Sequence, residues 1–315
     1  MKPYAFGVDI GGTTVKIGLF STEGKFLENW EIPTRKEESG GFILPDIAEA
    51  ISRKLEELNI SVDDLEGVGV GVPGPVRADG IVNKCVNLGW GVFDVRSTLS
   101  ELLGGVPVEV ANDANVAALG EQWNGGGKGF ANVVMVTLGT GVGGGIIIGG
   151  RILNGAHGAA GEIGHLKVND NETEVCGCGK KGCLEQYASA TGVVRITKRG
   201  LAANESADTP LRSLPEITAK DVFDYAKTGD RFSLDMVDEM GTLLGEALAH
   251  ITCVVDPDVV VIGGGVSRAG QILLDAVQRH YVPAAFHGCR EIPFKLAVLG
   301  NDAGMYGAVR MVLSK

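Results

Sequence analysis

The chain has 315 residues, 44% of them hydrophobic and 21% charged, a balance typical of a soluble globular protein long enough for two domains. Its net charge of −11 argues against nucleic acid as the main partner. The 48 glycines gather in short clusters, which predict loops where the backbone approaches a ligand closely.

The N-terminal residues lack the basic and apolar regions of a signal peptide, because the chain enters an apolar strand directly. The longest uncharged run, Phe130–Gly150, contains seven glycines. A glycine turn between two strands fits this run better than a membrane helix. We therefore expect a cytoplasmic protein with no membrane partner.

The first motif is a glycine turn between two predicted strands, Ala5–Asp9 and Val15–Phe20. The turn lies between strands and no Gly-Lys-Ser/Thr is present, so it is not a Walker loop. It offers backbone amides and the hydroxyls of Thr13 and Thr14 to an anion, with Asp9 beside them for Mg²⁺. A plain hairpin turn is the alternative.

A predicted helix, Leu44–Leu58, and a buried strand, Gly67–Val72, follow the first turn. Pro73 and Pro75 break the strand, and a polar loop with aromatic residues comes next, Asn83–Gly91. In that loop Trp90 either forms a stacking wall for a sugar or packs into the core.

Another strand, Pro107–Ala111, is followed by Asn112 and Asp113 and then by a helical pattern, Ala114–Trp123. An Asp at this place either caps the helix or belongs to a site. Ligands of α/β sheets bind at the carboxyl ends of strands, which favours the site.

A second glycine turn follows the predicted strand Val133–Leu138 and precedes the strand Ile146–Ile148. Its letters match the dinucleotide fingerprint Gly-x-Gly-x-x-Gly, but no helix follows, which excludes a Rossmann motif. The turn is similar to the first one. Two such elements predict an internally duplicated fold with a phosphate chain bound between its halves.

The stretch Gly161–Glu185 carries four potential metal ligands within 19 residues, namely His165, Cys176, Cys178 and Cys183. This set suits tetrahedral Zn²⁺ with no open position, so the metal would be structural. Glu162 and Glu185 bracket the cluster, and zinc would hold both for a polyhydroxylated ligand. The alternatives are three reduced cysteines in a mobile loop or, less favoured by Cys-x-Cys geometry, a disulfide.

The last third of the chain predicts three helices, a strand with a glycine loop, and a closing helix. They are Val193–Ala203, Ala219–Thr228, Leu234–Val255, Val259–Ile262 with Gly263–Ser267, and Ala303–Leu313. The three glycines after the strand suit the close approach of a base or ribose; a tight strand-to-helix turn is the alternative.

Together these residues resemble the ROK family of sugar kinases, part of the actin–hexokinase superfamily. The most specific match is Gly164-His165 leading to Cys176-Gly-Cys178 and Gly182-Cys183-Leu-Glu185. The turns Asp9–Thr13 and Leu138–Gly141 are similar to the phosphate motifs of the family, and Gly263–Gly265 to its adenosine loop. Val72–Val76 and Asn83–Trp90 look most like the bacterial glucokinases within it.

The resemblance implies a duplicated actin/hexokinase-like (ribonuclease H-like) α/β fold with two domains around a cleft. The small domain would comprise residues 1–112 and 301–315, closed by the C-terminal helix. Residues 113–300 would form the larger domain, which carries the zinc loop. A homodimer or a dimer of dimers is expected.

The resemblance also implies transfer of the ATP γ-phosphoryl group to the 6-hydroxyl of a sugar, with glucose as the expected substrate. Asp113 would be the catalytic base, and Asp9 would hold Mg²⁺ through ATP. The implied sugar-binding residues are Gly74, Asn87, Asn112, Asp113, Glu162, His165 and Glu185. The implied ATP-binding residues are Asp9, Gly11, Gly12, Thr13, Thr14, Lys16, Gly139, Thr140, Gly141, Gly263, Gly264 and Gly265.

Other functions of the same family are the alternatives. An N-acetylmannosamine or N-acetylglucosamine kinase would use the same fold and donor. A non-catalytic sugar sensor would bind sugar without ATP turnover, and Asp113 argues against it. The repressors of the family carry a helix-turn-helix before the first glycine turn, for which the eight residues before Asp9 leave no room.

Overall fold

The computed structural model describes residues 2–314, and their contacts form two compact units. The first unit contains residues up to 131, residues 145–161 and residues from 299 on; the second contains residues 132–144 and 162–298. These units differ from the expected domains, 1–112 plus 301–315 and 113–300. The helix that follows Asn112 belongs to the first unit because it packs against the C-terminal helix.

The first unit is built on a five-stranded sheet in the order β3-β2-β1-β4-β7. Its strands are β1 (Tyr4–Ile10), β2 (Thr14–Ser21), β3 (Phe26–Pro33), β4 (Leu65–Val72) and β7 (Val108–Asn112). β1 pairs antiparallel with β2, whereas β1, β4 and β7 are parallel. Asp9 pairs with Gly71, and Val72 pairs with Asn112. The parallel strands β1, β4 and β7 therefore place Asp9 and Asn112 near their carboxyl ends, on the same side of the sheet's strand termini.

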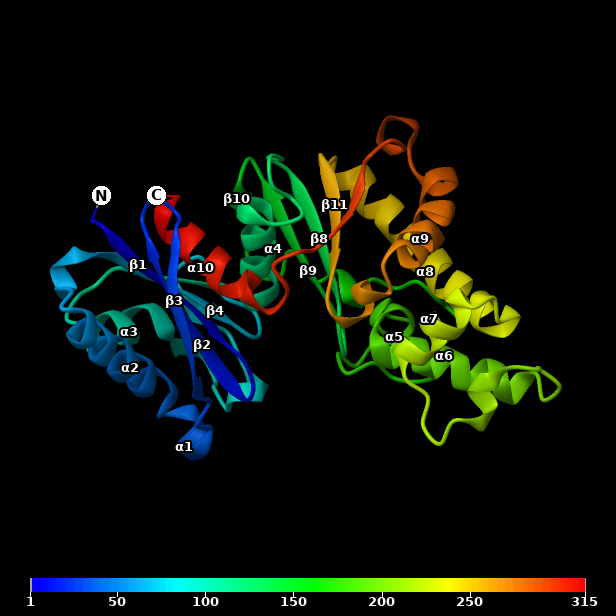
Figure 1. The fold of residues 1–315 in the computed structure, drawn as a ribbon, viewed down its shortest axis with the longest axis horizontal. Helices are drawn as coiled ribbons and strands as arrows, with labels where there is room; N and C mark the ends of the chain where they lie inside the picture. Colours follow the sequence, from blue (N-terminus) through cyan, green and yellow to red (C-terminus); the bar gives the residue numbers. More distant parts are fainter. Residues whose placement is uncertain (1, 315) are drawn as a thin grey trace. The chain divides into compact units, whose positions relative to one another are not determined.

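Helices cover both faces of this sheet (Figure 1). α2 (Ile43–Leu58) and α3 (Val95–Leu102) bury an apolar stripe that includes Ile47 and Ile51 against one face. On the other face, α4 (Asp113–Asn124) packs against α10 (Ala303–Leu313). A Cβ at Gly307 would lie 1.7 Å from the Val116 carbonyl oxygen, so the two helices approach this closely only because residue 307 is glycine.

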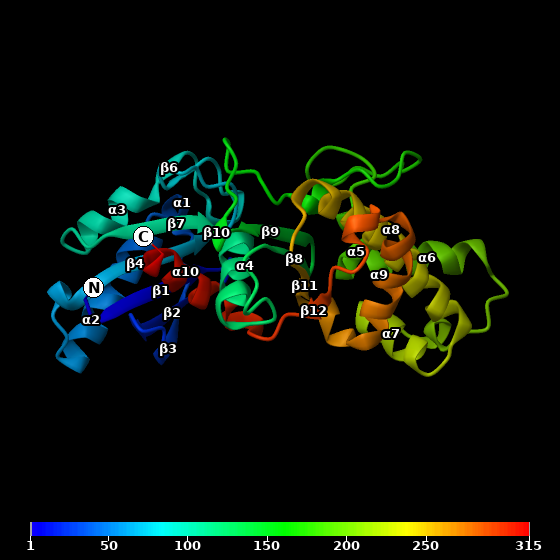
Figure 2. The ribbon, with the colours of Figure 1, turned by 90° about the horizontal axis from the view of Figure 1, so that it is seen from above.

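The second unit contains three parallel strands, β8 (Val133–Leu138), β11 (Val259–Gly263) and β12 (Phe294–Leu296). Four helices pack on the long helix α8 (Arg231–Val255): α5 (Glu185–Ala188), α6 (Ala190–Ala203), α7 (Ala219–Lys227) and α9 (Gln271–Ala284). α8 and α9 run side by side in both views (Figures 1 and 2). The strands of this unit are almost entirely apolar, as expected for parallel strands buried on both faces.

The remaining α-helix and strands are α1 (Glu37–Gly40), β5 (Ile81–Val82), β6 (Phe93–Asp94) and the hairpin of β9 (Val142–Ile148) with β10 (Arg151–Ile152). β9 crosses the boundary between the units at residues 144 and 145. None of the helices between residues 2 and 314 combines the length and apolar character that crossing a bilayer requires.

The expected mixed α/β fold is confirmed, and most predicted elements lie within a few residues of the observed ones. The second glycine turn is shorter than expected, because Gly143–Gly145 belong to strand β9. Several elements escaped the sequence analysis, the longest of which are β3, α3 and α9, together with the short strand β12. β3 alternates polar and partly buried residues, and Pro283 lies inside α9, so both patterns are weak as sequence signals.

Candidate active site

The turn between β1 and β2 is tight and open on its outer side. The Gly11 N–H donates to the Thr14 carbonyl at 3.0 Å, and Thr34 Oγ1 donates to the Gly11 carbonyl at 2.8 Å. Thr13 and Thr14 are exposed, and a Cβ at Gly12 would meet no described atom within 4 Å. An anion could therefore reach the backbone of this turn.

Asp9 lies at the end of β1 against helix α10. A Cβ at Gly304 would come within 2.4 Å of Asp9 Oδ2, so the helix backbone lies directly beside the carboxyl group. Burial, followed by the negative charge of Asp113, raises the pKa of Asp9 to about 6, although Lys16 acts to lower it. The Asp9 carboxylate thus has little compensating positive charge, which a divalent cation could supply through a hard oxygen ligand.

Lys16, predicted to bind ATP, contacts the segment before α10. Its Nζ donates to the Asn301 carbonyl at 3.3 Å and lies 3.7 Å from Glu31 Oε1 and 4.0 Å from Asp302 Oδ1. These contacts are weak at a partly exposed site, so a phosphate could replace them.

Asn112 and Asp113 lie together at the start of helix α4, where Asp113 Oδ1 also accepts the Ala114 N–H at 2.8 Å. Asn112 is the N-cap of α4, because its Oδ1 accepts the N–H groups of Ala114 at 3.0 Å and Asn115 at 3.2 Å. Its Nδ2 donates to the Gly74 carbonyl at 3.1 Å and to Asp113 Oδ1 at 3.0 Å. Asp113 is the first helical residue, and Asn112 orients its carboxylate at the carboxyl end of β7.

The loop that carries Asn87 is anchored by a buried tryptophan. Trp90 is 6% exposed, and its Nε1 donates to the Gly40 carbonyl at 3.1 Å. Its ring packs against Phe93 with centroids 5.1 Å apart. Trp90 therefore packs in the core of the first unit, whereas Asn87 is exposed.

In the second unit, the turn between β8 and β9 is fixed to the start of α6. The Ala190 N–H donates to the Gly139 carbonyl at 2.8 Å, and Thr191 Oγ1 donates to the Thr140 carbonyl at 2.7 Å. Glu185 Oε2 accepts the Val142 N–H at 3.1 Å. The predicted phosphate turn and a predicted sugar ligand are therefore joined within one unit.

The four predicted metal ligands meet in the cysteine loop, which we define as residues 165–183. One ligand atom from each of His165, Cys176, Cys178 and Cys183 lies within 4.8 Å of all the others. Cys178 Sγ is 3.6 Å from Cys183 Sγ, and Cys176 Sγ is 3.8 Å from His165 Nδ1. A tetrahedron with Zn–S bonds of about 2.3 Å has edges of about 3.7 Å, so the cluster fits a zinc ion.

Burial governs two of the three thiols of this cluster when no metal is bound. It raises the pKa of Cys183 to about 12 and also raises the pKa of Cys176. Burial acts in the same direction on the exposed Cys178, but the backbone N–H of Lys180 and the contacts with the other two thiols outweigh it and lower the pKa of Cys178. A zinc ion binds thiolates, so its binding would release protons from these sulfurs.

A cavity of about 370 Å³ lies beside the third glycine motif in the second unit. Gly265 and Val266 form one side, and helix α7 contributes Phe223 and Lys220. Ala190, which also bonds to the turn at Gly139, lines the same cavity. Apolar walls with nearby cations, connected to a glycine turn, suit a base and ribose followed by a phosphate chain.

Sequence reasoning missed the α7 wall of this cavity. The glycine motif predicted one wall, but Phe223 and Lys220 lie about 40 residues earlier in an ordinary amphipathic helix. Their only signal is the helical period, which every amphipathic helix shares.

The predicted site residues are distributed over both units. Asp9, Gly74, Asn87, Asn112 and Asp113 belong to the first unit, with the turn at residues 11–16. Glu162, His165 and Glu185 belong to the second, with the motifs at 139–141 and 263–265. Glu162 is exposed beside the cysteine loop. The roles of these residues in binding sugar and ATP stay predictions.

Comparison with known proteins assigns the chain to one family, and the relatives described below are sugar kinases. Residues 5–315 match the model of the ROK family. A glucokinase of Halalkalibacterium halodurans is 44% identical over 308 residues, which cover 96% of this chain and 92% of that protein. A Streptomyces griseus ROK family glucokinase, solved in complex with glucose and AMPPNP, is 34% identical with a TM-score of 0.75 and 98% coverage of both chains. An N-acetylgalactosamine kinase of Shewanella sp. is 31% identical over 96% of this chain and 94% of that protein.

Proposed function

Because this chain belongs to the ROK family, we propose that it is a kinase that transfers the γ-phosphoryl group of ATP to the 6-hydroxyl of D-glucose. The observation that carries the proposal is the 44% identity with a glucokinase over nearly the whole chain. The actin/hexokinase-like fold, shared with a glucokinase solved with glucose and an ATP analogue, supports it.

In the proposed reaction Asp113 accepts the proton of the sugar 6-hydroxyl. The oxygen then bonds to the γ-phosphorus while the bond from that phosphorus to the β-γ bridging oxygen breaks, which yields glucose 6-phosphate and ADP. Asn112 holds the Asp113 carboxylate through its amide, 3.0 Å from Oδ1, and caps α4. Because phosphoryl transfer depends on positioning more than on a strong base, an aspartate suffices.

A divalent cation such as Mg²⁺ accompanies ATP in such a kinase, where it neutralises charge on the phosphates. The buried Asp9 carboxyl, whose raised pKa reports a lack of compensating charge, is the residue we propose to hold it through ATP. The exposed hydroxyls and glycines at residues 11–14 would bind the phosphates, together with Lys16 and the turn at 139–141. The cavity beside Gly263–Gly265 would take the adenosine.

We propose that the sugar-binding residues are Gly74, Asn87, Asn112, Asp113, Glu162, His165 and Glu185. Within the second unit, Glu185 Oε1 lies 3.7 Å from Cys176 Sγ, so the cysteine cluster and this carboxylate share one framework. We propose that a structural Zn²⁺ on His165, Cys176, Cys178 and Cys183 stiffens that framework.

An N-acetylhexosamine kinase is the second candidate, and the 31% identity with an N-acetylgalactosamine kinase favours it specifically. A sensor without turnover has less support, because Asp113 stands at the carboxyl end of a strand beside its orienting amide. We place the reaction in the cytoplasm, in keeping with six free cysteines in the described chain, and we expect a homodimer or a dimer of dimers.

The test is a turnover assay of the purified protein with ATP, Mg²⁺ and glucose. We expect ADP and glucose 6-phosphate in equal amounts, with the phosphate located on the 6-oxygen by phosphorus NMR. Binding of glucose without ADP formation would instead support the sensor. Light scattering of the same sample measures the assembly.

A further inference from the structure

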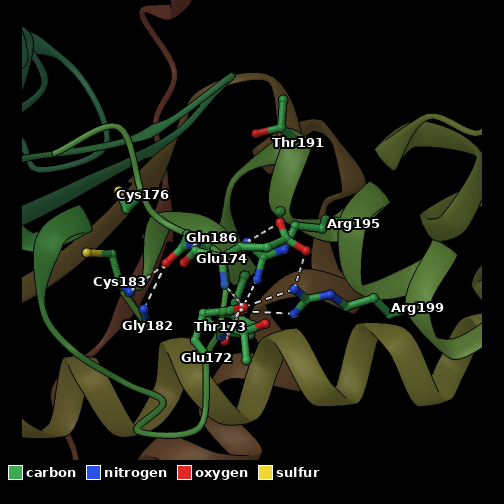
Figure 3. A network of polar contacts seen from close by, with 12 residues as sticks. Glu172, Thr173, Glu174, Cys176, Gly182, Cys183, Gln186, Thr191, Arg195 and Arg199 are labelled. Carbon is green, nitrogen blue, oxygen red and sulfur yellow. Dashed lines mark hydrogen bonds and ion pairs between the residues drawn. The ribbon is translucent and has the colours of Figure 1, made fainter. Parts of the chain in front are cut away.

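A buried carboxylate, Glu172, ties the cysteine loop to helix α6 (Figure 3). Its side chain is 1% exposed. Arg199 donates two parallel hydrogen bonds to it, Nη1 to Oε2 at 2.9 Å and Nη2 to Oε1 at 2.9 Å. Arg195, one turn earlier on α6, also donates to Oε2. These charged, bidentate contacts are the strong kind of polar contact.

The same carboxylate also holds helix α5 and its own loop. The Tyr187 hydroxyl donates to Oε2 at 2.5 Å, and Asn169 Nδ2 donates to the Tyr187 oxygen at 2.9 Å. Oε1 accepts the backbone N–H groups of Thr173 and Glu174, each at 2.9 Å. Glu172 therefore fixes the backbone that leads directly into Cys176.

A second side chain, Gln186, holds the other arm of the loop. Its Oε1 accepts the N–H groups of Gly182 at 2.9 Å and Cys183 at 3.1 Å, and its Nε2 donates to the Glu174 carbonyl at 3.1 Å. Gln186 follows Glu185 in α5. The two arms of the cysteine loop and the Glu185 carboxylate are thus connected through one helix turn.

We propose that Glu172 is a positioning residue: it sets the spacing of Cys176 from Cys183 and, through α5, the orientation of Glu185. It touches neither the four candidate metal ligand atoms nor the Glu185 carboxylate in the contacts of the described residues. It acts through Arg199, Tyr187 and the loop backbone. Metal binding and sugar binding should then depend on it together. The inference rests on the proposed sugar kinase function for its kinetic readout only.

The central variant is Glu172→Gln, which keeps the size of the side chain and removes its charge. We expect zinc affinity, measured by competition with a chelator, to fall about 10–100-fold, as changes around metal ligands do. The KM for glucose should rise at least about tenfold, while the KM for ATP changes less than about twofold, because the contacts of Glu172 with the described residues include none of those that line the adenosine cavity.

The matched control is Asp235→Asn, which also removes a carboxylate from an ion pair in the second unit. Asp235 pairs with Arg231 at 3.0 Å on the exposed side of α8. Zinc affinity and both KM values should stay at the wild-type level, because exposed pairs contribute little.

Arg199→Lys is a second variant that tests the same contact if Glu172→Gln does not fold. Arg199 is 41% exposed, so the replacement is accommodated, but lysine cannot form the two parallel hydrogen bonds. We expect an effect in the same direction as Glu172→Gln and smaller. Wild-type zinc affinity and glucose KM in both variants would overturn the proposal. A joint rise of the glucose and ATP KM values would also overturn it, because Glu172 would then support the fold in general.

Amide hydrogen exchange of residues 173–183 separates this inference from the proposed function. It needs neither bound metal nor turnover. Faster exchange of these amides in Glu172→Gln than in Asp235→Asn supports the positioning role even if the wild type fails to phosphorylate glucose. Equal exchange in the two variants overturns the role whatever the substrate is.

Discussion

Glu185 accepts the backbone N–H of Val142 on its Oε2 at 3.1 Å, so a carboxylate predicted to bind sugar is bonded to the first residue of β9. Its other oxygen lies 3.7 Å from Cys176 Sγ. One side chain thus contacts both the end of the predicted phosphate turn and the cysteine cluster. Within the second unit these two features form one framework, and a change in either should affect the other.

Gly141→Ala tests this framework directly. A Cβ at residue 141 would lie 2.2 Å from Glu185 Oε2, so the carboxylate must move. We expect a loss of about 1–3 kcal/mol in the free energy of unfolding, the usual cost of overpacking, together with a lower kcat/KM for glucose. Gly139→Ala is the stability control, since the nearest atom to its Cβ is 4.0 Å away. Equal unfolding midpoints in urea for the two variants would argue against the contact.

Asp113→Asn should remove turnover while leaving the fold intact. Asn112 caps α4, and the amide oxygen of an Asn at position 113 can still accept the Ala114 N–H that Asp113 Oδ1 accepts at 2.8 Å, so the helix start should survive. We expect kcat to fall at least about a hundredfold, the lower range for loss of a general base, with a much smaller change in glucose KM. Asp94→Asn is the matched control, because Asp94 caps α3 by accepting the Ser97 N–H at 2.9 Å. Near-normal kcat in Asp113→Asn would exclude the base role.

Asp9→Asn should stabilise the protein at neutral pH when ATP and Mg²⁺ are absent. Burial raises the Asp9 pKa from 3.8 to about 6, so the folded state holds this proton more tightly than the unfolded chain. The stability that this provides is fully present below 3.8 and is lost as the pH rises through 6. The variant should therefore exceed the wild type by about 2–3 kcal/mol at pH 7.5 and match it near pH 4.

Urea unfolding of wild type and Asp9→Asn at the two pH values measures this difference. The same variant should lose affinity for Mg²⁺ with ATP, because the proposed carboxylate ligand is gone. If the free energies of unfolding of the two proteins differed by the same amount at pH 4 and pH 7.5, the Asp9 carboxyl group would not have the raised pKa on which this prediction depends.

Cys178→Ser should lower zinc content, thermal stability and glucose affinity together. Elemental analysis of the wild type should give about one zinc per chain, since the four ligand atoms leave no open position. Cys253→Ser, at an exposed cysteine of α8, is the control and should change none of the three. A metal-free wild type with full activity would refute the structural zinc.

Much of the fold was predictable because apolar residues recur at regular spacing along most of its strands and helices. The closing helix Ala303–Leu313 has its predicted bounds, and β8 likewise matches Val133–Leu138. The cysteine cluster was predictable because ligand spacing in sequence reflects ligand spacing in space, and the four ligand atoms do converge.

Other parts of the site depend on contacts that no local pattern encodes. The sequence left open whether Asp113 caps its helix, and only the hydrogen bonds to Asn112 Oδ1 assign the cap. Glu172 belongs to no motif, and its role follows from arginines 23 and 27 residues away. The sequence left a sugar-facing Trp90 open beside the commoner packed one, and the hydrogen bond that decides for packing goes to Gly40, 50 residues earlier.

The most direct test of the proposed function is kcat/KM for a panel of hexoses with ATP and Mg²⁺. The carboxylates of Glu162 and Glu185 accept hydrogen bonds from the hydroxyls of glucose, and a zinc-bound His165 donates its remaining ring N–H to a hydroxyl oxygen. A polar group left unpaired when a sugar covers it costs roughly 1–3 kcal/mol. We expect glucose to exceed 2-deoxyglucose, mannose and the N-acetylhexosamines by at least about tenfold. A higher kcat/KM for N-acetylmannosamine, N-acetylglucosamine or N-acetylgalactosamine than for glucose would contradict the assignment to glucose.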